Sequence, residues 1–407
     1  MLLIPLLTSC NPTRRTLNAS PTSLDTESIT DSPLINTASM EIRTATVASI
    51  DCDSIQHQED PAGMLLLTKI NEGINVDIYL YDINNNHFRR VTENSSRDYM
   101  PAITSDGKRL VFISDRNHPR KNGLFFVEVN KTLDPSLTIE NVNSLKELVV
   151  PTEFVVENPV WSFDNKWVAY VAVYENHSYI DVLNPDSGEG TRVKSNSIWN
   201  KYPTWAKDSN DLYILNENEN NDYATLIQNI SLKEIFENIY SHENILNQNI
   251  YGPAGLSLNQ RSEILLTIDD QNTSGIYKIL PGNSQEIIEV YKKEDEDAWG
   301  AIWSPDGEWI AFQVKEKEGN NTSIYIANEK TKEIFKVFTN SQVEAKSITW
   351  SPESKLLSYT RKEGKSTYYI DIISINAIIK NIEGCNYIPI EIGPIESNLL
   401  KMYSWIM

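Results

Sequence analysis

The sequence has few cysteines, few histidines and none of the common enzyme motifs. Its 407 residues include three Cys and five His, and no two His residues have the spacing of a His-x-x-x-His ligand pair. Gly255 to Asn259 begins like the nucleophile elbow Gly-x-Ser-x-Gly, but the last glycine is missing. No glycine-rich loop of the kind that holds a phosphate is present. The sequence therefore predicts no catalytic residue, no metal ligand and no cofactor.

Positive charge is scarce as well. Lys and Arg number 36 against 56 Asp and Glu, which gives a formal net charge of −20 at pH 7. A chain this acidic repels nucleic acid and anionic membrane surfaces, so long-range attraction cannot support binding to either. We interpret the charge as a source of solubility and expect no nucleic-acid partner.

The N-terminus resembles a targeting signal. Met1 to Thr8 is almost wholly apolar, and Leu7-Thr8-Ser9-Cys10 resembles the lipobox of bacterial lipoproteins. The resemblance implies that residues 1–9 are a signal peptide and that Cys10 carries a lipid after cleavage. The apolar run is short and no Lys or Arg precedes it, so we expect the true start to lie further upstream. The alternative is a cytosolic N-terminus with a chance cysteine. No later segment is long enough to span a bilayer.

The segment after Cys10 has the composition of a tether. Residues 11–50 are rich in Ser, Thr and Asn and lack a sustained apolar period, so we assign residues 10–55 to a flexible linker. The other cysteines, Cys52 and Cys385, flank the rest of the chain. In an exported protein they are expected to form one disulfide that ties the two ends together. Two unrelated free thiols are the alternative.

A short phrase recurs through the remainder of the chain. It is clearest as Trp303-Ser304-Pro305-Asp306-Gly307 followed by a β-rich run, and it returns from Trp350. Its first residues stand at positions 103, 161, 205, 256, 303 and 350, between 44 and 58 residues apart. Each unit has four short alternating runs, and Asp-Gly or Asn supplies the tight turn between the first two. Four-stranded units at this pitch form the blades of a β-propeller.

The phrase resembles the TolB-like, WD40-like (PD40) β-propeller repeat, whose pattern is Pro-x-Trp-Ser-Pro-Asp-Gly-Lys. Matching residues are Trp303 to Gly307, Trp350 to Pro352, and Pro159 with Trp161 and Ser162. The likeness covers roughly residues 60 to 407, and we assign residues 56–407 to the propeller. The resemblance implies the fold, and it implies docking of a protein or peptide at a propeller face. Function does not follow from it, since propellers host many unrelated activities.

The chain ends predict how the ring closes. Residues 63–92 contain strands two, three and four of a unit that lacks a first strand, and the tail ending in Trp405-Ile406 reads as a lone first strand. We therefore expect an all-β, seven-bladed propeller whose C-terminal strand completes the first blade and removes an open sheet edge. A six-bladed ring, with residues 60–92 packed outside it, is the alternative.

One stretch departs from the β pattern. Ser231 and Glu234 form a capping box, and five apolar residues then fall on one helical face: Leu232, Ile235, Phe236, Ile239 and Tyr240. The pattern predicts a short helix over residues 231–241 that docks on the rim of the fourth blade. A partner-binding element is the alternative.

Four aromatic residues are candidates for partner binding. They lie just before predicted first strands, at one mouth of an axial channel: Tyr99, Tyr202, Tyr251 and Trp299. Aromatic side chains dominate binding hot spots because they bury a large area at low entropy cost. Packing between the blades is the alternative reading of all four.

These observations favour a non-catalytic scaffold. We expect a monomeric lipoprotein of the bacterial cell envelope, outside the cytoplasm, anchored by the lipid on Cys10 and binding a protein or peptide at a propeller face. TolB has a separate α/β domain before its propeller, and residues 11–55 are too few for one, so a role in the Tol system is not expected. The alternative is a propeller-type lyase or glycosidase acting on extracellular polysaccharide, although no motif places the carboxylates or metal-bound histidines that it would need.

Overall fold

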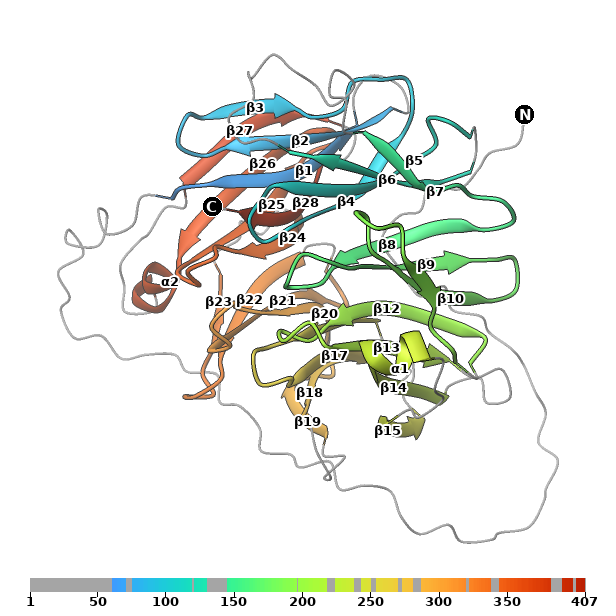
Figure 1. Ribbon diagram of the computed structural model, residues 1–407. Helices are drawn as coiled ribbons and strands as arrows, with labels where there is room; N and C mark the ends of the chain where they lie inside the picture. Colours follow the sequence, from blue (N-terminus) through green and yellow to red (C-terminus); the bar gives the residue numbers. More distant parts are fainter. Residues whose placement is uncertain are drawn as a thin grey trace, which may run out of the picture.

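The computed structural model shows seven four-stranded antiparallel sheets arranged in a ring, which is a seven-bladed β-propeller (Figure 1). The structure describes residues 61–70, 75–118, 121–129, 145–195, 197–217, 224–237, 243–249, 254–269, 273–280, 287–319, 322–337, 344–381, 390–397 and 400–406. The predicted fold and blade number are therefore confirmed, and the six-bladed alternative is wrong.

Each blade is ordered from its first strand, nearest the axis, to its fourth strand, at the rim. Blade 1 is β28 (Leu400–Ile406), β1 (Met64–Ile70), β2 (Val76–Asp82) and β3 (His87–Arg90). Blade 2 is β4 (Asp98–Ile103), β5 (Arg109–Ser114), β6 (Gly123–Glu128) and β7 (Lys146–Val149). Blade 3 is β8 (Val155–Trp161), β9 (Val168–Val173), β10 (Ser178–Leu183) and β11 (Gly190–Arg192). Blade 4 is β12 (Trp199–Trp205), β13 (Asp211–Glu217), β14 (Ala224–Ser231) and β15 (Glu243–Asn249).

The other three blades follow the same order. Blade 5 is β16 (Ala254–Leu258), β17 (Ile264–Asp269), β18 (Ser274–Ile279) and β19 (Ile287–Tyr291). Blade 6 is β20 (Glu296–Trp303), β21 (Trp309–Glu316), β22 (Thr322–Asn328) and β23 (Ile334–Lys336). Blade 7 is β24 (Glu344–Trp350), β25 (Leu356–Glu363), β26 (Thr367–Ser374) and β27 (Ile390–Glu396). Two short helices, α1 (Leu232–Glu237) and α2 (Ile375–Asn381), follow β14 and β26.

The last strand closes the ring as the sequence predicted. β28 pairs antiparallel with β1, from Met64 opposite Ile406 to Lys69 opposite Leu400. Figure 1 shows the red C-terminal strand beside the blue β1. Trp405 lies opposite Leu65, and its Nε1 donates a 2.8 Å hydrogen bond to the carbonyl oxygen of Ala62. The pairing covers the edge of β1 that would otherwise be open.

The recurring phrase forms a turn that is locked by its own side chains. Ser304 Oγ donates to Asp306 Oδ1 (2.5 Å), and the same carboxylate oxygen accepts the backbone N–H of Glu308 (3.0 Å). Ser304 Oγ also accepts the N–H of Trp309 (2.9 Å), and Gly307 takes the left-handed conformation with φ 72°. These bonds satisfy backbone groups between the first and second strands, which explains why Ser, Asp and Gly recur there.

Hydrophobic side chains fill the seams between consecutive blades. Each of the seven buried clusters combines residues of two neighbouring blades, and the cluster of Leu65, Ile370 and Trp405 joins blade 7 to blade 1. Tryptophans of four first strands also donate Nε1–H to a carbonyl oxygen of the preceding blade: Trp161 to Ala102 (3.0 Å), Trp205 to Val160 (3.3 Å), Trp303 to Glu263 (3.2 Å) and Trp350 to Ile302 (3.4 Å). The hydrophobic core is therefore divided into seven clusters, each of which lies between two neighbouring blades.

The register of blade 5 differs from the sequence-based alignment. Leu258 pairs with Ile264, as Trp303 pairs with Ile310, so the phrase begins at Leu258 rather than at Leu256. Asn259 then takes the place of the serine, and its Oδ1 accepts the N–H groups of Arg261 (2.9 Å) and Glu263 (3.0 Å). The side-chain oxygen of an asparagine can accept the backbone N–H groups that a serine hydroxyl and an aspartate carboxylate accept in the other blades. Because Asn259 replaces these residues, the sequence pattern alone gave the wrong register for blade 5.

The predicted helix on blade 4 is confirmed over the described residues Leu232–Glu237. α1 ends at Glu237, and residues 238–242 lie outside the described residues. Ser231 N donates to Glu234 Oε2 (3.0 Å) and Glu234 N donates to Ser231 Oγ (3.3 Å), which is the capping box. Ile235 is buried in the seam between blades 3 and 4, and the ring of Phe236 lies 4.9 Å from that of Trp167. The helix is docked on the propeller.

Trp405→Ala tests the closure. Trp405 is buried to 6% exposure in the seam between blades 7 and 1, so its truncation is expected to reduce the free energy of unfolding by about 3–5 kcal/mol in urea titrations. Phe163→Ala is the control, because Phe163 is 42% exposed and its loss should cost about 1 kcal/mol or less. Equal losses in the two variants would contradict a closing role for the last strand.

Candidate functional site

The first strand of every blade is interrupted by a bulge at a similar place. First strands of neighbouring blades contact one another, for example β24 with β28 and β28 with β4, so these strands surround the axis of the ring. In β4 the register jumps between Tyr99 and Ala102, and corresponding shifts occur in the six other first strands. A bulge bends the strand and changes the direction of its side chains, and bulges are common next to binding sites.

The bulges force five first strands into the left-handed backbone region at one equivalent position. The residues are Met100 (φ 47°), Asn158 (48°), Tyr202 (50°), Gly300 (65°) and Ser347 (50°). Four of them are not glycine, although side chains disfavour this region. The bulges of consecutive blades are neighbours, since the N–H of Asn158 lies 3.5 Å from Met100 Sδ. Because the positive φ recurs at the same position in five blades, we infer that the fold itself, and not the local sequence, imposes this backbone conformation next to the axis.

We use the term inner rim for the residue four positions before the phrase begins in each first strand. In six blades this residue directly precedes the bulge, whereas in β28 the bulge lies between Met402 and Ser404. The inner rim consists of Lys401, Tyr99, Glu157, Lys201, Ala254, Trp299 and Lys346. Two of the predicted partner-binding residues, Tyr99 and Trp299, share this position, and Tyr202 lies one residue further on, in the bulge of blade 4. Sequence reasoning missed Glu157 and the lysines as site residues, because the bulge that defines their common position leaves no sequence signature.

Tyr99 is half-buried and packs against the hydrophobic cluster between blades 2 and 3. Burial raises the pKa of its hydroxyl; the charge of Arg97 acts in the opposite sense, while the nearby Glu157 raises it further. Tyr99 is therefore a neutral phenol at physiological pH. Its packing against this cluster agrees with the alternative that the aromatic residues pack between the blades. Tyr99 is also close enough to Glu157 for the two side chains to interact electrostatically.

Glu157 is the acidic residue of the inner rim. Its side chain is half-buried, and within the described ranges no hydrogen bond or ion pair holds its carboxylate. Burial raises the pKa of Glu157, and the positive charge of Lys201 on the next blade only partly opposes this shift. A carboxylate with a raised pKa and no direct partner is typical of a functional site rather than of a structural ion pair.

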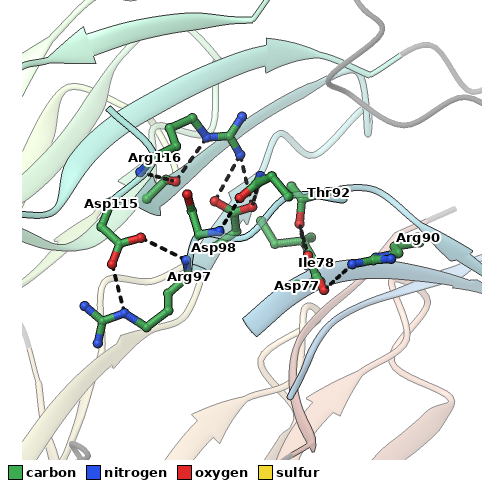
Figure 2. Close-up of polar contacts among 11 residues, drawn as sticks. Asp77, Ile78, Arg90, Thr92, Arg97, Asp98, Asp115 and Arg116 are labelled. Carbon is green, nitrogen blue, oxygen red and sulfur yellow. Dashed lines mark hydrogen bonds and ion pairs between the residues drawn. The ribbon is translucent and has the colours of Figure 1, made fainter. Parts of the chain in front are cut away.

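One buried and one partly exposed ion pair fix the backbone that leads into Tyr99 (Figure 2). Asp98 is fully buried, and Arg116 Nη2 lies 3.0 Å from each of its carboxylate oxygens. The guanidinium of Arg116 also lies 5.0 Å from the centre of the Phe112 ring. Arg97 binds Asp115 through its backbone N–H (2.9 Å) and its Nε (3.0 Å). These contacts tie the loop before β4 to the loop after β5, so the blade 2 part of the inner rim is held rigidly.

A second polar group fixes the neighbouring edge of blade 1 (Figure 2). Asp77 is fully buried, and Arg90 Nη2 donates to its Oδ2 at 2.8 Å. The hydroxyl of Thr92 accepts the backbone N–H of Ile78 (3.0 Å) and donates to Asp77 Oδ1 (3.4 Å). Since Thr92 lies between β3 and β4, these bonds anchor the chain as it passes from blade 1 to blade 2.

Several predicted site residues lie outside the described residues, namely Cys10, Cys52, Cys385 and Tyr251. The lipid anchor and the disulfide stay predictions. Within the described ranges, no group of three or more His, Cys, Asp or Glu side chains could hold a metal ion. None of the helices in those ranges has the length and apolar character required to cross a membrane.

Known structures share this fold at low sequence identity. The β-propeller domain of the Trilobed protease from Pyrococcus furiosus is 14% identical, with a TM-score of 0.55 over 77% of this chain and 94% of that chain. A prolyl endopeptidase is 12% identical, with a TM-score of 0.53 over 69% of this chain and 41% of that one, so the match spans less than half of the peptidase. TolB from Acinetobacter baumannii is 15% identical, with a TM-score of 0.48 over 90% and 88%.

The likenesses to the Pyrococcus domain and to the prolyl endopeptidase, whose TM-scores exceed 0.5, support the fold alone. The Pyrococcus domain is described as having an open velcro topology, whereas β28 pairs with β1 in this chain. No protein-family profile matches the sequence, and no curated protein matches it either. The function must therefore be argued from the inner rim itself.

Glu157→Gln tests whether the inner rim carries an uncompensated charge. The folded-state pKa of Glu157 lies above its unfolded value, so the folded state loses stability as the pH rises through these two values. The glutamine variant should therefore melt at a higher temperature than the wild type at about pH 7, and the difference should vanish below about pH 4, where the unfolded glutamate is also protonated. A lower melting temperature for the variant at neutral pH would contradict this reading.

Proposed function

We propose that the protein is a monomeric lipoprotein of the bacterial cell envelope whose propeller serves as a non-catalytic scaffold for a protein or peptide partner. The partner binds at the inner rim and presents a basic side chain to Glu157. Cys10 carries the lipid, and residues 10–55 form the tether between the membrane and the propeller. The carboxylate of Glu157, half-buried and without a direct partner, carries the proposal.

The energetics of Glu157 support a partner of this kind. A buried charge without a close counter-charge costs stability, and natural proteins retain such groups mainly where binding or catalysis uses them. A Lys or Arg of a partner would supply the missing charge in a partly desolvated site, where an ion pair is stronger than in water. The cost borne by the free protein is then offset in the complex.

The surroundings of Glu157 favour binding of a partner to a surface that is already ordered, and not to a flexible loop. Tyr99 lies on the preceding blade and is packed into a seam, and the loop that leads to it is fixed by the Arg116–Asp98 and Arg97–Asp115 pairs. A partner therefore meets a surface that is already ordered, which lowers the entropy cost of binding. Trp299 and Tyr202, both half-buried, supply further aromatic surface near the axis.

Binding is tested with four versions of the full chain, all carrying Cys10→Ala so that they are free of lipid. One has no other change, and the others add Glu157→Gln, Trp299→Ala or Phe163→Ala. Proteins captured from native envelopes are identified by mass spectrometry, and their dissociation constants are then measured with purified components. Loss of the ion pair should weaken binding about tenfold or more, which corresponds to about 1.4 kcal/mol.

The Phe163→Ala chain is the matched control, because Phe163 is exposed in a turn at the opposite ends of the first strands. We expect it to bind as tightly as the chain without a further change. A partner that binds all four chains equally would contradict binding at the inner rim. Release of sugars from extracellular polysaccharide by the purified protein would contradict the non-catalytic role.

The anchor is tested by metabolic labelling with a radioactive fatty acid. The wild-type chain is expected to incorporate the label, and Cys10→Ala is expected to lose it, because the thiol is the attachment site. Cys52→Ala is the matched control and should be labelled like the wild type. Label that persists in Cys10→Ala would refute the anchor, whereas the binding experiment above would be unaffected.

A further inference from the structure

The seam between blades 3 and 4 contains three buried polar atoms that have no partner in the described part of the chain. They are Asn216 Oδ1, Asn216 Nδ2 and Asn200 Oδ1. Asn216 is 0% exposed and Asn200 is 1% exposed, so neither side chain reaches bulk water. A buried donor or acceptor without a hydrogen bond costs about 1–3 kcal/mol, and such groups are rare in folded proteins.

The two side chains lie next to each other on one face of blade 4. Asn200 of β12 and Asn216 of β13 are direct partners in the antiparallel ladder, and the Cβ atoms of such partners are about 4.5–5.5 Å apart. Leu212 and Ile214, on the same face of β13 as Asn216, belong to the cluster that joins blades 3 and 4. Both amides therefore face blade 3.

The polar groups next to the Asn200 side chain are bonded to one another. Asn200 Nδ2 donates to the carbonyl oxygens of Ser178 (2.7 Å) and Ser197 (3.1 Å). Ser178 Oγ donates to the carbonyl oxygen of Asn200 (2.8 Å) and accepts its backbone N–H (2.9 Å). These bonds hold the Asn200 side chain in one orientation, so its Oδ1 cannot turn away to find a different partner.

The three atoms define the hydrogen-bonding character that a bound molecule must have here. Two of them are acceptors and one is a donor, so the ligand must donate twice and accept at least once. A metal cation would suit the two oxygens but would be repelled by Asn216 Nδ2, and an ammonium ion has no lone pair to accept its proton. Water donates two hydrogen bonds and accepts up to two, which matches the two acceptors and the one donor.

We propose that a single water molecule is bound between Asn200 and Asn216. It donates one hydrogen bond to each Oδ1 and accepts one from Asn216 Nδ2, so all three atoms are satisfied at once. The site lies in the seam between blades 3 and 4, next in sequence to Lys201 of the inner rim. The inference is independent of the proposed function, since it concerns the integrity of the seam in the free protein.

A high-resolution crystal structure of the protein tests the site directly. We expect a water peak within about 2.7–3.2 Å of all three atoms. A direct hydrogen bond between Asn216 Nδ2 and Asn200 Oδ1, with no water between the two side chains, would overturn the proposal.

Thermal melting of Asn216→Leu gives a second, independent test. Leucine has a similar size but cannot hold the water, so Asn200 Oδ1 is left buried without a partner and the melting temperature is expected to fall by about 2–4 °C. Ile214→Leu is the matched control on the same face of β13, and it should keep the water in its crystal structure. A melting temperature that is unchanged or raised in Asn216→Leu would show that the amide has no ligand in the wild type.

Discussion

The pairing of β28 with β1 is the constraint on which the rest of the structure depends. Without it, blade 1 would have three strands and an open inner edge, and the cluster at the seam between blades 7 and 1 would lose Leu400, Met402 and Trp405. In a ring of sheets every blade packs between two others, so one open seam weakens the packing of the blades on both sides. The pairing also supplies Lys401, the blade 1 member of the inner rim.

The inner rim shows how a repetitive fold presents a surface that does not repeat. The bulge recurs from blade to blade, but the inner-rim residue is a lysine, a tyrosine, a glutamate, an alanine or a tryptophan according to the blade. Backbone geometry is thus fixed by the repeat, and chemical identity is free to vary. Rigid ion pairs such as Arg116–Asp98 hold the loops that enter the rim, so specificity resides in a few side chains on an ordered frame.

The fold could be read from the sequence because the turn phrase uses side chains that the turn requires. Ser304, Asp306 and Gly307 each satisfy a particular backbone need, and Trp405 in the anchor position identified the closing strand. The phrase gave the wrong register only at blade 5, where Asn259 accepts the same backbone hydrogen bonds with a different side chain.

Of the candidate site, the sequence indicated Tyr99 and Trp299 but not Glu157. The lack of a partner for Glu157 depends on which side chains the neighbouring blades bring together, and the sequence does not show this. Likewise, the left-handed conformations of Met100 and Tyr202 are imposed by the bulge and contradict their own residue preferences.

Native-state hydrogen exchange of the two closing strands tests the closure most directly. In a closed ring the amides of β28 and β1 that bond across the ladder should exchange as slowly as those of β25 and β26, in the centre of blade 7, because all of them open only when the propeller unfolds. Fast exchange throughout β28, together with slow exchange in β25 and β26, would contradict the closed ring and the inner rim that it completes.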